Sequence, residues 1–490
     1  MKKYFSILLA SAFLLSANAQ ERKIDFVEYD LDNGMHVILH EDNSTPIVAV
    51  SVMYHVGSKN ENPDRTGFAH FFEHLLFEGS QNIERGEYDK YVERNGGTLN
   101  ANTSQDRTYY YEIFSSNNLE LGLWLESERL LHAKVEQIGI ETQREVVKEE
   151  KRQRVDNQPY GSFMAEAFDR LFDKHPYEWT PIGYMEDLDA AQEEDYINFY
   201  QTFYVPSNAT LSIAGDIDID EAQKMIDKYF GSIPKGQAIN LYRDFLMLDE
   251  EAFKAQHGFE KSIFSEEDFF NKSSKEGMKM IKKYEAIPTV IPRPNVKEPA
   301  LEEAKIDTIY DNIQLPAVFM AYHSPAQNTK DSYALEMLNS VLAGGTSSRL
   351  NKRIVEEKEL AVSAFSFNFP LEDPGMALVA GIAAKDVDLK DLQDALDKEI
   401  NLAKTELVTE EEFQKVKNQF ENQFYSSNSS VAGKAESLAN NYVYYGNTNL
   451  VNEQLSVYDD ITREDLQRVA KKYFKEDARV ILYYLPKDEQ

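Results

Sequence analysis

A five-residue segment, His70-Phe71-Phe72-Glu73-His74, places three polar side chains inside a strongly apolar stretch of the chain. In a helix, residues four apart lie one above the other, and at about 100° per residue Glu73 falls in the same sector as the two histidines. Buried imidazoles need polar partners, and a metal ion held by both is the simplest one. The apolar neighbours disfavour the alternative, a helix with two surface histidines. Those neighbours are Phe68, Phe71, Phe72, Leu75, Leu76 and Phe77.

The residue types in this segment suit zinc chemistry. Two neutral imidazoles can occupy adjacent corners of a zinc tetrahedron, and a nearby carboxylate can hold the attacking water. The 490-residue chain has no cysteine, which excludes thiolate ligands, a thiol nucleophile and a disulfide framework. The third protein ligand is therefore a carboxylate or a third histidine, and the spacing alone leaves both open.

The charge balance argues against some classes of partner. Lys and Arg number 52 against 84 Asp and Glu, which gives a formal charge of −32. Nucleic acids and anionic membrane surfaces reward basic patches, so we expect neither as the main partner. Beyond the first residues, no apolar run approaches about 18 residues, so we expect no membrane span.

Residues 1–19 are typical of a secretory signal peptide. Lys2 and Lys3 form a positively charged start, Tyr4 to Ser16 is largely apolar, and Ala17-Asn18-Ala19 is a small-x-small cleavage site. An apolar run of about 14 residues is too short to span a bilayer, which needs about 20. We therefore expect cleavage near Ala19 and a periplasmic or secreted protein, with a buried N-terminal helix as the alternative.

Hydrophobic periodicity predicts strands and helices that alternate in clusters, which favours the α+β class. Turn residues at Asp32-Asn33-Gly34 predict a hairpin over residues 25–39. The other strands expected in the first half are 47–56, 98–103, 108–114 and 209–214, and the expected helices are 67–77, 119–131, 138–153 and 194–203.

The second half repeats the pattern of the first, which indicates an internal duplication. An expected helix over 462–474 and strand over 479–484 repeat the helix–strand pair that ends the first half. In a duplicated chain, one half can keep the chemistry while the other supports it. We place the halves at residues 20–236 and 301–490. The remaining elements expected in the second half are strand 317–322, helix 332–342 and helix 411–423.

Residues 237–300 differ in composition from both halves. Arg243 to Tyr284 is rich in Glu, Lys, Asp and Phe, and Ile287 to Pro294 carries three prolines. We interpret this segment as a linker with a charged helical insertion, and we favour a solvated connector over a functional lid.

Several motifs around the histidine segment resemble one family. The chain is similar to the inverted-zincin metallopeptidases of the pitrilysin, insulin-degrading enzyme and mitochondrial processing peptidase family, in its short two-domain bacterial form. The resemblance spans nearly all of the mature chain except the insertion. The motifs are Val56-Gly57-Ser58, Gly67-Phe68-Ala69, Phe77-Glu78-Gly79-Ser80, Asn100-Ala101-Asn102-Thr103, Arg144-Glu145-Val146-Val147-Lys148-Glu149-Glu150, Asn157-Gln158-Pro159-Tyr160-Gly161, Tyr204-Val205-Pro206-Ser207-Asn208 and Gly215-Asp216.

The resemblance implies the third ligand and the fold. Glu150 matches the family's third zinc ligand, with the adjacent Glu149 as the alternative, and one Zn²⁺ per chain is implied. Gln143 stands where several relatives have a glutamate that supports the site. Each half is expected to pack helices on a mainly antiparallel sheet, with the two halves facing each other across a cavity.

The implied activity is that of a zinc-dependent endopeptidase acting on extended peptides. Zinc activates a water molecule, and Glu73 acts as the general base that accepts its proton. The segment from Asn100 to Thr103 resembles the family's substrate-binding edge strand. Asn100 and Ala101 are therefore the expected substrate-binding residues.

One departure from the family pattern concerns the second half. Complete members carry an Arg and a Tyr that bind the substrate carbonyl, whereas the matching stretch here has Lys358 and Val362. Two alternatives follow: a zinc-bearing subunit that is inactive without a homologous partner supplying the Arg and Tyr, or a non-catalytic structural subunit. Because two halves make half of the family's clamshell, we expect a homodimer or a heterodimer with a homologous subunit.

Overall fold

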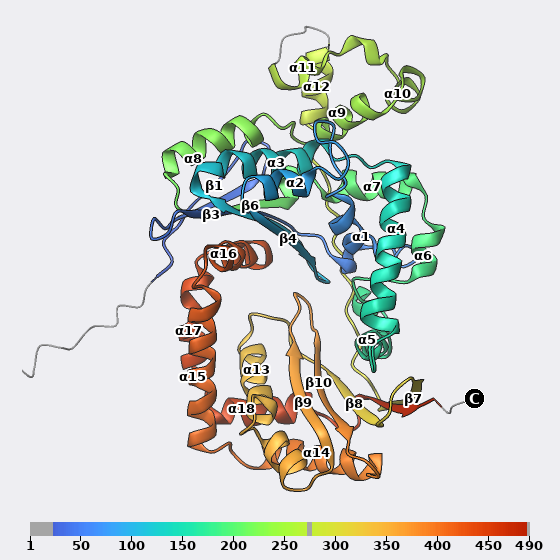
Figure 1. The fold of residues 1–490 in the computed structure, drawn as a ribbon, viewed down its shortest axis with the longest axis vertical. Helices are drawn as coiled ribbons and strands as arrows, with labels where there is room; N and C mark the ends of the chain where they lie inside the picture. The colour runs from blue at the N-terminus through green and yellow to red at the C-terminus, as the bar shows by residue number, and fades with distance from the viewer. Residues whose placement is uncertain (1–22, 272–276, 488–490) are drawn as a thin grey trace, which may run out of the picture.

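The computed structural model describes residues 23–271 and 277–487, and the expected signal peptide at 1–19 lies outside them. Two sheets divide the chain into two halves, one above the other in Figure 1. In the described part of the chain, no helix combines the length and the apolar character that a membrane crossing requires.

The first half contains a six-stranded sheet in the order β1-β2-β6-β3-β5-β4. All its neighbours are antiparallel except β2 and β6. The helices pack mainly on one face. The strands are β1 (Val27–Asp30), β2 (His36–Glu41), β3 (Ile47–Tyr54), β4 (Thr98–Thr103), β5 (Thr108–Ser115) and β6 (Ala209–Gly215), and the helices are α1 (Phe68–Leu75), α2 (Tyr88–Arg94), α3 (Leu119–His132), α4 (Gln137–Lys151), α5 (Phe163–Leu171), α6 (Met185–Ala190), α7 (Glu193–Phe203) and α8 (Ile219–Ile226).

The second half contains a five-stranded sheet in the order β7-β11-β8-β10-β9, with only β7 and β11 parallel. This order and pairing repeat β2-β6-β3-β5-β4, which agrees with the expected duplication and confirms the predicted α+β class. The strands are β7 (Lys305–Asp311), β8 (Ala317–His323), β9 (Ala361–Phe369), β10 (Met376–Ala383) and β11 (Val480–Pro486), and the helices are α13 (Lys330–Ala343), α14 (Leu389–Thr405), α15 (Glu410–Ser427), α16 (Val431–Tyr445), α17 (Leu450–Asp459) and α18 (Arg463–Tyr473).

Both faces of the first sheet are buried, and β3 shows why. Its side chains alternate between the two faces, as in every strand. Val50 and Val52 belong to the core under the helices of the first half. Ala49 and Met53 belong to small clusters on the opposite face. Both sets are fully buried, which explains the nearly continuous apolar run in this strand.

The two halves exchange one helix each. Helix α16 belongs to the second half by sequence but covers the free face of the first sheet, as Figure 1 shows. The Ser212 hydroxyl on β6 donates to the Ala435 carbonyl of α16 over 2.9 Å. Reciprocally, Phe168 and Leu171 of α5 pack against the second sheet beside Phe319. This exchange was not predicted, and it joins the halves through buried apolar surface.

The segment expected to be a solvated connector is instead a helical subdomain. Three of its phenylalanines are buried in a cluster continuous with the core of the first half: Phe253 is fully buried, and Phe264 and Phe269 nearly so. The predicted helical character of the insertion is confirmed. Its many phenylalanines support a packed core, whereas its high charge content had suggested a solvated segment. The helices are α9 (Ala238–Met247), α10 (Glu250–His257), α11 (Glu266–Asn271) and α12 (Gly277–Glu285).

A buried ion cluster also connects the halves. Lys59, only 4% exposed, lies 2.8 Å from Asp106 and also pairs with Glu372 on the β9–β10 loop of the second half. His55 lies 3.0 Å from the same Glu372 carboxylate. Burial opposes ionisation of Glu372, but the hydrogen bond from His55 and the charge of Lys59 outweigh it and lower the pKa of this carboxyl to about 2.

The junction should therefore weaken in acid. A carboxyl with a lowered pKa stabilises the folded state above its ordinary pKa of about 4.3, and this contribution is lost as pH falls from there toward about 2. Urea unfolding should show Glu372→Gln less stable than the parent by about 3 kcal/mol at pH 7, with the difference shrinking toward pH 2. A difference that does not change with pH would contradict this assignment; Glu453→Gln, an exposed carboxyl on α17, is the control.

Candidate metal centre

Helix α1 begins at a buried carboxylate. Gly67, before the helix, has φ +85 and offers no side-chain cap. Glu61 takes that role: its two carboxylate oxygens accept hydrogen bonds from the backbone N–H groups of Gly67 (2.9 Å) and Ala69 (2.8 Å). Trp179 Nε1 donates to the same carboxylate over 2.9 Å. The carboxylate thus satisfies helix-start N–H groups that would otherwise be unpaired.

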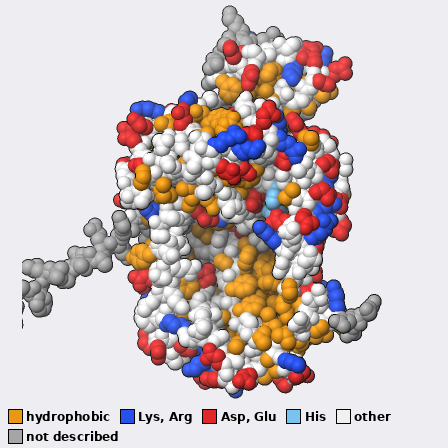
Figure 2. All heavy atoms as spheres, viewed as in Figure 1, with side chains coloured by type: hydrophobic (Ala, Val, Ile, Leu, Met, Phe, Trp, Pro, Cys, Tyr) orange, Lys and Arg blue, Asp and Glu red, His pale blue; other side chains and the backbone are white. Residues whose placement is uncertain are grey.

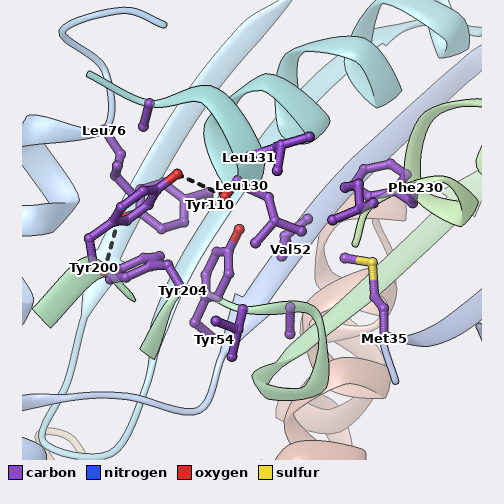
Figure 3. Close-up of a cluster of buried hydrophobic side chains, with 14 of the residues drawn as sticks. Met35, Val52, Tyr54, Leu76, Tyr110, Leu130, Leu131, Tyr200, Tyr204 and Phe230 are labelled. Carbon is purple, nitrogen blue, oxygen red and sulfur yellow. Dashed lines mark hydrogen bonds between the residues drawn. The ribbon is translucent and has the colours of Figure 1, made fainter. Parts of the chain in front are cut away.

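Aromatic packing holds the middle of α1. Phe68 stacks on Tyr196 with ring centroids 4.6 Å apart, and Phe72 stacks on Phe199 at 5.2 Å. The Tyr110 hydroxyl donates to the Phe72 carbonyl over 3.1 Å. Figure 3 shows Tyr110, Tyr200 and Tyr204 gathered beside Leu76, just past the end of the helix. These contacts confirm the predicted burial of the apolar face of α1, and they turn the polar face of the helix away from the core.

A buried arginine lies under the C-terminal end of α1. Arg129 on α3 is 1% exposed and pairs with Glu112 and Glu126, each over 3.1 Å. Its guanidinium lies over the rings of Phe77 (4.4 Å) and Tyr110 (4.2 Å). Breaking such a buried ion pair by removing one partner typically costs about 3–5 kcal/mol. This cluster and Glu61 therefore fix the two ends of the same helix.

Three side chains converge on the polar face of α1. His70 Nε2 and His74 Nε2 lie 3.3 Å apart. Glu150 Oε2, from α4, lies 3.1 Å from His74 Nε2 and 3.6 Å from His70 Nε2. In the part of the chain that the structure describes, these three residues form the only group of metal-type donors this close together.

The spacing of the three donors fits a tetrahedral zinc ion. Zinc bonds of about 2.0–2.1 Å at tetrahedral angles place two ligand atoms about 3.3–3.4 Å apart. The observed separations of 3.1, 3.3 and 3.6 Å bracket that value. Two imidazoles and a carboxylate are also a typical donor set for catalytic zinc.

The structure separates the two adjacent glutamates. Glu150 is 13% exposed and directs one oxygen to the histidines, while Arg154 holds the other over 2.6 Å. Glu149 is 53% exposed and pairs with Arg152 instead. Geometrically, only Glu150 belongs to the cluster.

The protonation states favoured at this cluster also suit the binding of a cation. Burial lowers the pKa of His70, and the neighbouring His74 lowers it further. The hydrogen bond from His74 lowers the pKa of Glu150. A neutral imidazole and an ionised carboxylate are the forms that bind metals.

Glu73 lies next to this cluster and is tied to the edge strand. Thr103, the last residue of β4, donates its hydroxyl to Glu73 Oε2 over 2.6 Å. Burial raises the pKa of Glu73, and the Thr103 hydrogen bond opposes that shift. The contact joins the carboxylate on α1 to a strand with one unpaired edge, because β4 is the last strand of its sheet.

The two residues expected to bind substrate lie on this free edge. Asn100 is exposed and Ala101 is partly buried. The Ala101 N–H donates to the Asn100 side-chain oxygen over 2.8 Å rather than to β5. A backbone donor thus points outward from the sheet.

Gln143 and the two departures in the second half make no hydrogen bond to the cluster among the described residues. Gln143 donates to Glu78 over 2.5 Å instead. Lys358 is exposed, and Val362, at the start of β9, is 53% exposed.

Four residues that position the site were not identified from the sequence: Glu61, Thr103, Arg129 and Arg154. Thr103 lies inside a motif that signalled the edge strand, and Arg154 is one helical turn after Glu150. Glu61 and Arg129 carry no local signal, because their partners are distant in the sequence.

Two family models match the chain. One, described as insulinase (peptidase family M16), matches residues 36–172, and the other, described as peptidase M16 inactive domain, matches residues 190–420. The protein named zinc protease PqqE from Helicobacter pylori is 30% identical over 99% of this chain and 100% of its own length. A probable mitochondrial-processing peptidase subunit beta from Arabidopsis thaliana is 23% identical over 90% of this chain and 75% of its own length.

A solved structure is similar throughout. The crystal structure of a protease from Helicobacter pylori matches with a TM-score of 0.79 and 29% identity, covering 94% of this chain and 100% of that one. The likeness therefore extends over both halves.

Removing the Glu61 carboxylate should loosen α1. Glu61→Ala leaves the buried backbone N–H groups of Gly67 and Ala69 without an acceptor, while Trp179 Nε1 keeps the Ser58 carbonyl, so the free energy of unfolding should fall by about 2–4 kcal/mol. Urea denaturation measures this loss. Glu145→Ala, an exposed carboxyl on α4 (70% exposed), is the control and should cost little. A variant as stable as the parent would contradict the capping role.

Proposed function

The chain belongs to peptidase family M16, and from that premise we propose that it is a zinc-dependent endopeptidase that hydrolyses extended peptides. The observation that carries the proposal is the convergence of two imidazole nitrogens and one carboxylate oxygen within 3.1–3.6 Å of one another. The relative named zinc protease PqqE supports the same metal and reaction class.

His70, His74 and Glu150 would hold one Zn²⁺ per chain. There the ion would act as a Lewis acid toward the scissile carbonyl and lower the pKa of a bound water. Arg154 holds the second oxygen of Glu150, which leaves the first directed at the histidines. Residues that orient a ligand in this way contribute to metal affinity.

Glu73 is assigned as the general base. Its carboxylate accepts the proton of the attacking water and then delivers that proton to the leaving amine. Thr103 orients the carboxylate through its 2.6 Å hydrogen bond. Because Thr103 ends β4, the same contact sets the base against any peptide lying along that strand.

Substrate would bind by adding a strand to the free edge of β4. The outward Ala101 N–H supplies a backbone donor once the Asn100 side chain moves aside. Main-chain pairing of this kind requires an extended peptide and places few demands on its side chains. Figure 2 shows a hollow between the two halves, below this strand, that leaves room for it.

A second candidate is a zinc-bearing subunit that needs a homologous partner. Lys358 and Val362 stand where complete members carry Arg and Tyr, and the model matching residues 190–420 is described as an inactive domain. The Arabidopsis relative is named as a subunit. A heterodimer with a homologous chain that carries the Arg and Tyr would complete the site, which a homodimer of this chain would not do, and a non-catalytic structural subunit would leave Glu73 without a role.

We also propose a periplasmic or secreted location. Residues 1–19 have the charged start, apolar run and small-residue cleavage site of a signal peptide. N-terminal sequencing of the exported protein should find cleavage near Ala19.

Zinc content should depend on the three converging side chains. His70→Ala, His74→Ala and Glu150→Gln should each lose most of the metal, because each removes one of three protein ligands. Elemental analysis after dialysis measures zinc per chain, and about one is expected for the parent. Glu149→Gln is the matched control and should keep the ion. Equal loss from Glu149→Gln and Glu150→Gln would contradict the ligand assignment.

Cleavage should depend on Glu73 without loss of zinc. Glu73→Gln keeps the shape and the Thr103 contact but cannot accept a proton, so turnover should fall by about 10²–10⁴-fold. The assay is cleavage of a mixed peptide pool by the mature chain with zinc.

The same assay separates the two candidates. Cleavage by the parent alone would show a self-sufficient peptidase. Zinc binding without cleavage, restored by a homologous chain that carries the Arg and Tyr, would favour the subunit. Turnover retained in Glu73→Gln would remove Glu73 from the base role.

A further inference from the structure

A cavity of about 500 Å³ lies between the two halves, next to the edge strand. Its volume is in the usual range of ligand sites, about 300–1,000 Å³. Ser104 to Arg107, which directly follow β4, line one side, and the β9–β10 loop lines another. The helices α13, α15, α16 and α17 of the second half supply the remaining walls.

Three charged side chains line this cavity: Asp106, Arg107 and Glu336. Asp106 is paired with Lys59 at 2.8 Å, and Arg107 with Glu436 at 2.7 Å. No ion pair among the described residues includes Glu336, which receives only hydrogen bonds, from Tyr458 (3.0 Å) and Ser332 (3.4 Å). The cavity therefore contains one carboxyl whose charge is not matched.

Aromatic rings surround that carboxyl. Tyr458, whose hydroxyl reaches Glu336, packs against Tyr333 with centroids 5.0 Å apart and against Phe420 at 4.7 Å. Tyr445 lines the same cavity. Burial among these side chains raises the pKa of Glu336 to about 7. Ring faces together with a carboxylate are the combination that binds organic cations.

The cavity walls also offer unpaired hydrogen-bonding atoms. Asn428 Oδ1 and Gln327 Nε2 are buried and have no hydrogen-bond partner among the described residues. Both residues line the cavity. Buried polar atoms usually have partners, so one acceptor and one donor here are free for a bound molecule.

We propose that this cavity is a subsite for a cationic group of a bound peptide, with Glu336 as its counter-ion and Tyr333, Tyr445 and Tyr458 as the enclosing rings. The group is a lysine or arginine side chain or a peptide amino terminus. A peptide that pairs with β4 and continues past Thr103 passes Ser104 to Arg107, which line the cavity. The inference rests on the proposed function and adds a preference for basic peptides.

The test is peptide binding to the zinc-loaded Glu73→Gln chain, which cannot turn the probe over. The probes are fluorescent alanine–serine peptides, each with a single lysine at a different position, beside copies with norleucine in place of lysine. Lysine should bind about tenfold more tightly than norleucine at one or two positions, as expected for a charge-assisted contact. Acetylated and free amino ends distinguish the side chain from the amino terminus.

The double variant Glu73→Gln/Glu336→Gln should lose that preference while norleucine peptides bind as before. The matched control is Glu421→Gln in the same background, because Glu421 is exposed and follows the cavity residue Phe420 on α15. The Glu421→Gln control should keep the lysine preference. That result would show that the loss in the double variant does not come from the change in net charge. Tyr458→Phe, which removes only a hydroxyl, should lower the preference less, and thermal melting checks that each variant is folded.

Equal binding of lysine and norleucine peptides, or a preference that survives Glu336→Gln, would overturn the subsite. If either result is found and the parent chain still cleaves peptides, the proposed function stands without the subsite. A lysine preference abolished by Glu336→Gln in a chain that cleaves nothing would instead keep the subsite and count against self-sufficient catalysis.

Discussion

The arrangement of the candidate site depends on how one short helix is buried. Helix α1 is held at its start by the Glu61 carboxylate and at its end by the Arg129 ion cluster, with aromatic rings packed between them. These contacts leave the helix little freedom to rotate or slide. The polar face that carries His70 and His74 is therefore directed at α4, where Glu150 completes the set of donors. A donor spacing suited to a single ion is the consequence of that immobilisation.

The duplicated architecture gives the two halves different tasks. Both sheets share one strand order, but only the first half presents converging imidazoles and a carboxylate within the described residues. The second half contributes α16 to the first sheet, the β9–β10 loop to the Lys59 cluster and most of the walls of the Glu336 cavity. It thereby positions surfaces around the edge strand β4 without carrying the metal donors itself.

Sequence patterns predicted what depends on local periodicity. The β1–β2 hairpin and helices α1, α4 and α15 follow from alternation or from spacings of three and four, and His70, Glu73 and His74 follow from the geometry of one helix. Glu150 lies far along the chain, so it could be proposed only through the family resemblance. Strand β10 was missed because Met376–Ala383 is a continuous small apolar run without a period. The exchange of α16, the packing of the insertion and the roles of Glu61, Arg129 and Glu336 depend on contacts between distant segments, which no local pattern encodes.

Anomalous diffraction from crystals of the zinc-loaded mature chain would locate the metal ion itself. We expect a single strong peak per chain, bounded by Nε2 of His70, Nε2 of His74 and one carboxylate oxygen of Glu150, with Glu73 beside it and not bonded to it. A peak elsewhere, a peak that lacks either imidazole, or coordination by Glu149 would contradict the proposed metal site.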